Sequence, residues 1–307
     1  MKNVSAVQAT NDSEKIEKPE SQIIVMWDTL KKNKAAVVGL VIIILLSLIA
    51  LVTFFLGSKI YGTFLMPYDP EYSDMSASFI KPCAQHLFGT DQLGRDIFSR
   101  VISGTKISLV VGISAVSFSL VIGTVLGAIS GYFGGKIDSV IMRCMDVMLA
   151  IPSILLAITL MAALGAGLDK AIIAIGVVSI PEYARIVRSS ILSVKENDYV
   201  AAAKVIGNKD SRIIFRHILP NVVSSIVVRA TLGISGAILD TAALGFLGLG
   251  VQPPMAEWGD MLGRARGYIF SAPYTLIFPG FAITLAVLAF NLFGDGLRDA
   301  LDPKSRV

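Results

Sequence analysis

Charged residues are scarce in this chain of 307 residues. Asp, Glu, Lys and Arg together make up 16% of it, whereas soluble domains carry about 25%. The mean hydropathy is +0.69 and 54% of the residues are hydrophobic. An ordinary water-soluble domain is therefore excluded. A nucleic-acid-binding role is excluded as well, because no basic stripe is interleaved with aromatic residues.

Cysteine, histidine and nucleotide-binding motifs are also nearly absent. Cys83 and Cys144 lie far apart and have no metal-ligand spacing, so neither a metal site nor a disulfide is predicted. No G-x-x-x-x-G-K-[ST] segment occurs, and GYFGGK at 131–136 has the wrong spacing for a phosphate-binding loop. The chain itself is therefore not predicted to bind or hydrolyse ATP, and neither an enzymatic activity nor a cofactor is expected of it.

Long apolar runs are what the sequence does contain. Ala35–Leu56 carries no charge and exceeds the roughly 20 residues needed to cross a bilayer. A cleaved signal peptide is a poor alternative, because a long polar tail precedes this run. The tail ends in SQIIVMWDTLKKNK, which predicts a short helix at the membrane interface with Trp27 at headgroup depth. A soluble extension of the first span is the alternative.

Five further spans are predicted, with Gly-rich connectors between several of them, which gives an all-α integral membrane protein with six transmembrane helices. The expected spans are Ile107–Ile129, Ser139–Leu164, Ala171–Ile191, Val222–Leu247 and Tyr274–Phe293. The expected organisation is a tail and interfacial helix at 1–34, the first span at 35–56, an extracytoplasmic segment at 57–104, a five-span core at 105–294 and a C-terminal tail at 295–307.

The placement of Lys and Arg predicts the orientation. Cytoplasmic loops of membrane proteins hold the excess of these residues. Here Lys and Arg concentrate in the N-terminal tail, in the 185–216 region and at the C-terminus. Both termini and the 185–216 region are therefore expected in the cytoplasm, with the spans in contact with membrane lipid.

The stretch YVAAAKVIGNKDSRIIFRHILPN, at 199–221, is unusually charged for its apolar surroundings. Ala201–Ile206 favours a helix, Gly207 offers a C-cap, residues 209–219 resume helical spacing, and Pro220 is expected to end the segment before the next span. An amphipathic hairpin outside the bilayer indicates a docking surface. The alternative is a surface loop whose apolar residues touch only lipid.

This stretch resembles the cytoplasmic coupling loop of binding-protein-dependent ABC importer permeases. Ala202, Ala203, Gly207 and the pair Leu219-Pro220 match the pattern of that loop. Ala201 stands where the family has Glu, which removes a possible charged contact to the ATPase. His217 stands where the family pattern has Ile, and the resulting His-Ile-Leu-Pro ending resembles the peptide and nickel branch of the family. The resemblance implies that these residues contact a motor subunit: Ala201, Ala202, Ala203, Gly207, Arg212, Arg216, His217, Leu219 and Pro220.

Three other segments resemble the same branch in the expected order: HLFGTDQLGRDIFSR (86–100), AALGFLGLGVQPPMAEWGDML (242–262) and FNLFGDGLRDALDPK (290–304). The resemblance implies the type I permease fold of ABC importers with an extra N-terminal span, located in the inner membrane of a bacterial cell. It also implies a homologous permease as partner, two ATP-binding subunits that hold ATP and Mg²⁺, and an extracytoplasmic solute-binding protein. Trp258 is expected either to help receive that protein or to anchor the chain at the interface.

The implied cargo is a dipeptide or oligopeptide, with glutathione and nickel as alternatives. A transporter driven by an ion gradient is the rival class. Such a transporter needs an ionisable site in the membrane, and the sequence offers a candidate. Asp240, inside the fifth span, is the main candidate for such a site or for the lining of a transport pathway. Two further polar pairs are expected, Arg143 with Asp146, and Glu182 with Arg185 just after the helix-breaking Pro181.

An intramembrane protease is the enzymatic rival, because GISG at 233–236 matches the surroundings of a rhomboid serine. Ser235 would need a histidine within hydrogen-bond reach. His86 is expected outside the membrane, and His217 lies roughly 27 Å away along a continuous helix. The small residues Gly233, Ser235, Gly236 and Ala237 are therefore expected to allow close packing of helices.

Overall fold

The computed structural model describes residues 22–301, and within that range regular secondary structure is entirely helical. The polar tail predicted before residue 22 and the basic residues after 301 lie outside the described residues. The principal helices are α1 (Gln22–Lys32), α2 (Lys34–Leu56), α3 (Ile97–Phe133), α4 (Gly135–Leu149), α5 (Ser153–Leu164), α6 (Leu168–Lys195), α7 (Asp198–Val205), α8 (Asp210–Ile213), α9 (Leu219–Phe246), α10 (Trp258–Ala265) and α11 (Tyr274–Leu301).

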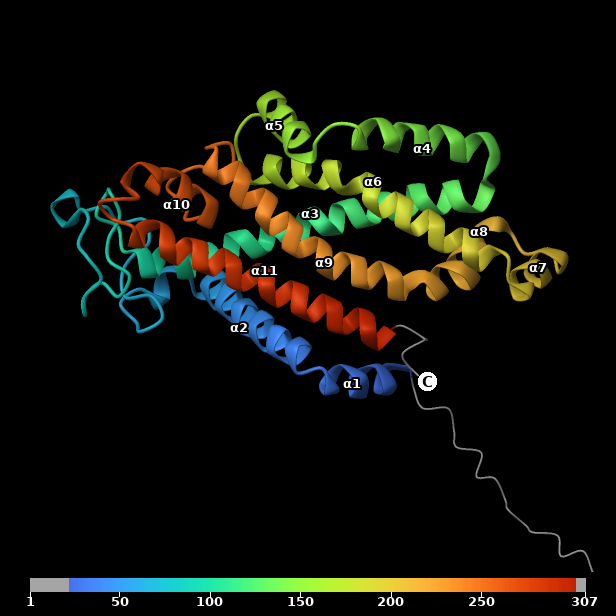
Figure 1. Ribbon diagram of the computed structural model, residues 1–307, viewed down its shortest axis with the longest axis horizontal. Coiled ribbons are helices and arrows are strands. Elements are labelled where there is room, and N and C mark those ends of the chain that lie inside the picture. Colours follow the sequence, from blue (N-terminus) through green and yellow to red (C-terminus); the bar gives the residue numbers. More distant parts are fainter. Residues whose placement is uncertain (1–21, 302–307) are drawn as a thin grey trace, which may run out of the picture.

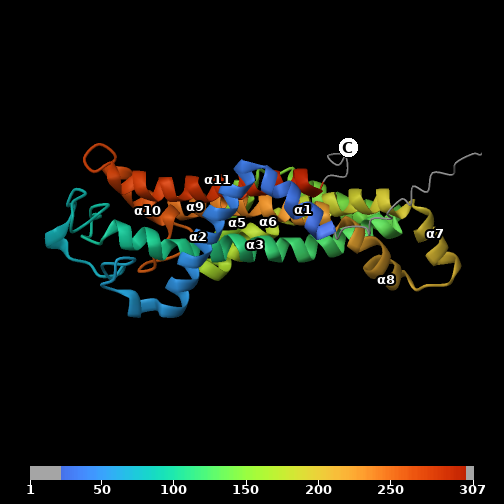
Figure 2. The same ribbon diagram turned by 90° about the horizontal axis from the view of Figure 1, so that it is seen from below.

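The helices form an elongated bundle (Figure 1). We call the end that carries α7 and α8 the hairpin end, and the end that carries residues 57–96 and α10 the loop end. The chain runs back and forth between these ends along α2, α3, the α4–α5 pair, α6, α9 and α11. The end of α11 meets α1 and the first turn of α2, because Leu30 of α1 and Ala36 of α2 pack with Leu297 and Ala300. Figure 2 shows α1 beside α2 in this arrangement.

Length and composition identify four helical segments of the described chain that could each cross a membrane. They are Lys34–Ile60, Ile97–Phe133, Asp210–Phe246 and Tyr274–Leu301. The α4–α5 pair makes a fifth if its two helices count as one span. The remaining predicted span corresponds to α6, which is long enough but carries Glu182, Arg185 and Arg188 in its second half.

The third predicted span, Ser139–Leu164, is broken by a sharp bend that the sequence analysis did not foresee. The structure divides it into α4 and α5, whose axes differ by 90°. The division falls at Pro152, which has an extended ψ of 129° and precedes the first residue of α5. Proline has no N–H to donate and its ring disfavours helical backbone in the preceding residue, so Ile151 and Pro152 interrupt the helix despite continuous hydrophobicity.

Pro181 was expected to break its helix, and this expectation was wrong. α6 continues through Pro181 from Leu168 to Lys195. Packing against α3 compensates for the lost backbone hydrogen bond. An added Cβ at Gly123 would lie 2.5 Å from Cβ of Tyr183, and one at Gly127 would lie 2.5 Å from the carbonyl oxygen of Ala184. The close approach of α3 and α6 over several turns holds the helix together across the proline.

Candidate functional site

The hairpin formed by α7 and α8 is the first candidate site. α7 ends in a left-handed turn at Gly207, whose φ is +84°. The Gly207 N–H donates to the carbonyl of Lys204 and the Asn208 N–H to that of Ala203, which satisfies carbonyls at the helix end. The predicted helix followed by a glycine cap is confirmed in this geometry.

The second arm of the hairpin does not end at Pro220, contrary to expectation. A wide π-type turn at Ile214–Ile218 follows α8, and α9 begins directly after it at Leu219. Pro220 therefore lies in the first turn of α9, where its missing N–H costs little. The extra residue in the wide turn is a common way to accommodate a nearby break in the hydrogen-bond ladder. As a result, helical backbone runs from Asp210 to Phe246.

The hairpin has one buried and one exposed face. Val200, Ala203, Ile213 and Ile218 are buried against the ends of α3 and α6. Val205, Ile206 and Phe215 are 87%, 79% and 70% exposed. Of the residues predicted to contact a motor subunit, Ala203 is buried and His217 and Leu219 are partly buried, and the exposed ones are Ala201, Ala202, Gly207, Arg212, Arg216 and Pro220.

Tyr132, at the end of α3, fixes the hairpin to the bundle, and the sequence reasoning missed it. Its hydroxyl donates to Oδ1 of Asp210 at 2.5 Å, and its carbonyl accepts from Nζ of Lys195 at 2.5 Å. The ammonium groups of Lys195 and Lys204 lie 5.7 and 5.1 Å from the centre of its ring. The signal was an aromatic residue in GYFGGK, a segment interpreted only as a connector.

A second missed contact joins α3, α4 and α6 near the hairpin. Arg188 donates from Nε to Oδ1 of Asp138 at 2.5 Å and from its terminal nitrogen to Oδ2 at 2.6 Å. The hydroxyl of Ser130 also donates to Asp138. This bidentate pair links helices whose contacting residues are far apart in sequence, and the planar guanidinium suits it.

The polar residues predicted in the membrane are brought together differently from the expected pairs. Asp146 accepts from Arg185 at 2.7 Å, and Glu182 pairs with Arg229 of α9. Arg143 is exposed and is not the partner of Asp146. Both predicted pairs were wrong, because the tertiary fold places a better partner on a neighbouring helix than the one a turn away.

Asp240 lines a cavity of about 430 Å³ between α5, α6 and α9, which we call the central cavity. Glu182, Tyr183, Arg229 and Gly236 also line it. A second cavity of about 690 Å³ opens nearer the hairpin end, among α6, α9 and α11, and includes Ser224, Ser225 and Arg298. Arg229 lines both cavities. The ion pair of Glu182 and Arg229 therefore lies where the two cavities meet.

The small residues of GISG, at 233–236, have different surroundings in the structure. Gly233 allows a close approach, since an added Cβ would lie 2.0 Å from the hydroxyl of Tyr183. Gly236 was expected to do the same, but an added Cβ there meets no atom within 4 Å. Its side of α9 faces the central cavity. Ser235 Oγ lies 2.7 Å from the Leu232 carbonyl and from Oδ1 of Asn291, so it links α9 to α11.

At the loop end, Trp258 is buried rather than presented at a surface. It is 1% exposed, and its Nε1 donates to the carbonyl of Val101 at 2.9 Å. Neither of its expected roles is compatible with this position. An indole needs a hydrogen-bond partner when buried, and the first turns of α3 supply one beside Gly104, which leaves room for the ring.

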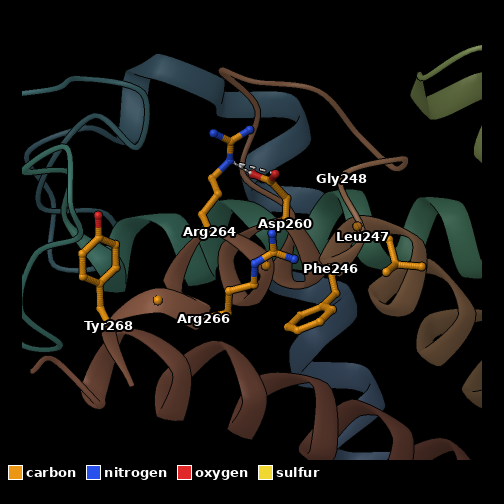
Figure 3. A pocket seen from close by; sticks show the side chains of 10 residues that line it. Phe246, Leu247, Gly248, Asp260, Arg264, Arg266 and Tyr268 are labelled. Atoms are coloured by element: carbon orange, nitrogen blue, oxygen red, sulfur yellow. Dashed lines mark hydrogen bonds and ion pairs between the residues drawn. The ribbon is translucent and has the colours of Figure 1, made fainter. Parts of the chain in front are cut away.

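A cavity of about 480 Å³ lies between the end of α9 and α10 (Figure 3). Arg264 and Asp260 point toward each other, and Arg264 Nε lies 2.8 Å from both carboxylate oxygens of Asp260. Glu257 caps α10 by accepting from the N–H groups of Gly259 and Asp260. Burial and the neighbouring Asp260 raise the pKa of the Glu257 carboxyl to about 7, against the lowering effect of these hydrogen bonds.

Comparison with known proteins agrees with this architecture. Residues 123–307 match the family model described as the binding-protein-dependent transport system inner membrane component. Residues 21–82 match the N-terminal transmembrane domain of oligopeptide transport permease C. The second match covers α2 and α1, so the span added before the core is itself a recognised element of these permeases.

Curated relatives are similar over most of the chain. The dipeptide transport system permease protein DppC of Alkalihalophilus pseudofirmus is 52% identical over 277 residues, which is 90% of this chain and 88% of the relative. The glutathione transport system permease protein GsiD of Pectobacterium atrosepticum is 47% identical over 276 residues, with the same coverage.

Among solved structures, the inward-facing MetNI methionine ABC transporter aligns with a TM-score of 0.55 at 20% identity. The alignment covers 66% of this chain and 97% of that chain. An amino acid ABC transporter aligns with a TM-score of 0.52 at 15% identity, over 66% of this chain and 94% of that one. These likenesses concern the fold. Together with the family matches, they show that the chain belongs to the permease family of binding-protein-dependent ABC importers, in the branch that contains DppC.

Proposed function

We propose that this chain is one of two permease subunits of an importer driven by ATP hydrolysis on partner subunits, and that its cargo is short peptides. The relatives named as dipeptide permeases support the cargo. The expected partners are a homologous permease, two ATP-binding subunits and an extracytoplasmic binding protein. Glutathione is the second candidate cargo, because a relative named as a glutathione permease is 47% identical.

The coupling role is supported by the two different faces of the hairpin. Its outward side presents exposed apolar residues at Val205, Ile206 and Phe215. Its inward side is fixed through buried residues and through Tyr132 to the ends of α3 and α6. A surface that docks a motor needs both features, an apolar contact area and a firm connection to the part that moves. Closure of the ATP-binding subunits would then move the hairpin as a body and switch the bundle between inward- and outward-facing states.

The hairpin end is proposed to face the cytoplasm, together with both termini. The concentration of Lys and Arg near that end supports this orientation. The two cysteines provide a test, because both are free and exposed. Cys83 lies in the loop-end segment and Cys144 in α4. A membrane-impermeant maleimide added to intact cells should label Cys83, and labelling of Cys83 only after the cells are broken would reverse the orientation.

The coupling role is tested at Gly207. Its left-handed backbone costs a residue with a side chain about 1–2 kcal/mol, and valine least tolerates it. We expect Gly207→Val to distort the turn, so that less ATPase subunit co-purifies with the permease and ATP-driven uptake of alanyl-alanine falls. Gly62→Val is the matched control, since Gly62 has a φ of +80° and equally open surroundings at the loop end.

Gly62→Val should keep the ATPase subunits bound. Uptake and ATPase retention that are unchanged in Gly207→Val, with both variants inserted at wild-type levels, would refute the coupling role. The same assay with glutathione or Ni²⁺ in place of the dipeptide decides the cargo. Uptake that survives ATP depletion while a proton gradient is kept would point to an ion-coupled transporter instead.

A further inference from the structure

The central cavity carries opposite charges at its two ends, both supplied by α9. Arg229, Gly233, Gly236 and Asp240 all line this cavity. Their spacing places them along one face of the helix, since residues three, four and seven apart are neighbours on a helix surface. Arg229 and Asp240 are about three turns apart, or roughly 16 Å along the axis. The result is a strip with a base at one end, an acid at the other and glycines between them.

The basic end has unused hydrogen-bonding capacity. A guanidinium group offers five N–H donors. Among the described residues, Arg229 donates to Glu182, and its Nε is buried without a partner. Such a group is costly to bury unless something accepts from it. Glu182 compensates the charge of Arg229 but leaves donors free for a second carboxylate.

The acidic end is also unpaired. Within the described part of the chain, the carboxylate of Asp240 makes no hydrogen bond or ion pair, and the residue is partly buried in the cavity lining beside Leu239 and Ala237. An ionisable side chain inside a membrane-spanning helix is expensive to keep, and residues of this kind usually serve a transported solute. A cationic group entering the cavity would be its natural partner.

We propose that the central cavity binds a short peptide as a zwitterion during transport, with the terminal carboxylate at Arg229 and the terminal ammonium at Asp240. This inference rests on the proposed function as a peptide importer and adds a binding site within the permease itself. Glu182 holds Arg229 in place when the cavity is empty and gives up part of this contact when the peptide carboxylate arrives. Dipeptides and glutathione share the two groups that the cavity recognises.

The dimensions agree with a small peptide. An extended dipeptide spans about 7 Å, and a hydrogen bond at each end adds about 3 Å. The side chains of Arg229 and Asp240 cover the rest of the roughly 16 Å between their positions. The volume of about 430 Å³ lies in the range of pockets for small ligands, about 300–1,000 Å³. Gly236, where an added Cβ meets no neighbour, keeps the middle of the strip open.

The test uses the whole complex in proteoliposomes, with its binding protein and with alanyl-alanine as the probe. Asp240→Asn keeps the shape and removes the charge. Arg229→Gln is combined with Glu182→Gln, so that no carboxylate is left without its partner. A charge-assisted hydrogen bond is worth about 1.5–3 kcal/mol, which corresponds to about a tenfold to hundredfold change. We expect initial uptake at low dipeptide concentration to fall about tenfold or more in each variant.

Arg185→Gln is the matched control. Arg185 lies on α6 and forms an ion pair with Asp146, as Arg229 does with Glu182, but it does not line the central cavity. Its uptake should remain near that of the wild type. Gly236→Leu supplies an independent test by filling the strip without changing a charge. It should leave the packing of helices within this chain intact, because no atom of the described chain lies within 4 Å of the added Cβ, and it should block uptake.

Direct binding separates recognition from folding. The permease complex in nanodiscs, without the binding protein, should bind alanyl-alanine more tightly than its N-acetylated or its C-amidated form. Asp240→Asn should bind alanyl-alanine and its N-acetylated form equally well, while it still discriminates against the C-amidated form. The double variant Arg229→Gln/Glu182→Gln should bind alanyl-alanine and its C-amidated form equally well, while it still discriminates against the N-acetylated form. Equal loss of both preferences in both variants, or wild-type uptake in Asp240→Asn or Gly236→Leu, would overturn the inference. Failure of the wild-type complex to import any dipeptide with ATP would instead refute the proposed function.

Discussion

The hydroxyl of Tyr132 provides the sharpest test of how the hairpin is held. Tyr132→Phe removes the donor to Oδ1 of Asp210 and leaves the ring, the backbone carbonyl contact with Lys195 and the two lysine–ring contacts in place. A hydrogen bond to a charged group contributes about 1.5–3 kcal/mol. Because Asp210 is exposed, water screens and partly replaces this contact, and we expect a loss of about 1 kcal/mol.

A loss of about 1 kcal/mol corresponds to roughly a fivefold increase in the population of the detached hairpin. Native-state hydrogen exchange reports such local opening directly. The amides of Gly207 and Asn208, which donate to Lys204 and Ala203, should exchange about five times faster in Tyr132→Phe. Exchange in α2 and α11 should not change, because neither helix contributes to the cluster that holds the hairpin.

Tyr274→Phe is the matched control. The hydroxyl of Tyr274 is buried and has no partner in the described structure, so its removal should be neutral or slightly stabilising. If Tyr132→Phe leaves hairpin exchange unchanged, the hydroxyl contact does not hold the hairpin, and attachment must come from the buried apolar residues alone. If Tyr274→Phe accelerates hairpin exchange equally, the effect is a general loss of stability.

Two further predictions concern ion pairs and pH. Arg188→Ala leaves the partly buried Asp138 without its bidentate partner and should lower the free energy of unfolding by about 2 kcal/mol. Arg185→Ala should lower it by less than about 1 kcal/mol, because both members of the Arg185–Asp146 pair are more than half exposed. Thermal unfolding in detergent compares the two variants, and equal losses would contradict the structural role given to the Arg188–Asp138 pair. The pKa of Glu257 is raised to about 7, so its contribution to stability is fully present below the ordinary carboxyl range and is lost as the pH rises through 7. The unfolding temperature should therefore fall between pH 5 and pH 8, and Glu257→Gln should flatten that dependence; a slope of equal size in the variant would assign it to another group.

Sequence reasoning was most successful where the signal is local. The uncharged run around α2 and the apolar runs of α9 and α11 predict spans because hydrophobic length alone decides them. Gly207 was identified as a helix cap because few residues other than glycine adopt its backbone conformation. These features depend on neighbours a few residues away, which a single sequence displays.

The errors arose where tertiary packing outweighs local preference. Hydropathy is continuous across Pro152, so it could not show the 90° bend, while Pro181 stays helical because α3 lies so close to it. The partners of Asp138 and Asp146 are 50 and 39 residues away in the sequence. No spacing rule reaches that far, and for the same reason the central cavity could not be assembled from Asp240 alone.

The contact between α9 and α10 has a consequence for signalling across the membrane. An added Cβ at Gly259 would lie 2.3 Å from the Ala242 carbonyl oxygen, and one at Gly263 would lie 2.5 Å from that of Phe246, so backbone rests on backbone without a compressible side chain between. The other end of the same uninterrupted helical stretch begins in the hairpin at Asp210. α10 and the hairpin are therefore joined through a single continuous helical stretch. If the hairpin binds the ATP-binding subunits, as proposed, and a ligand binds at α10, reciprocity requires each binding event to change the affinity of the other by the same factor.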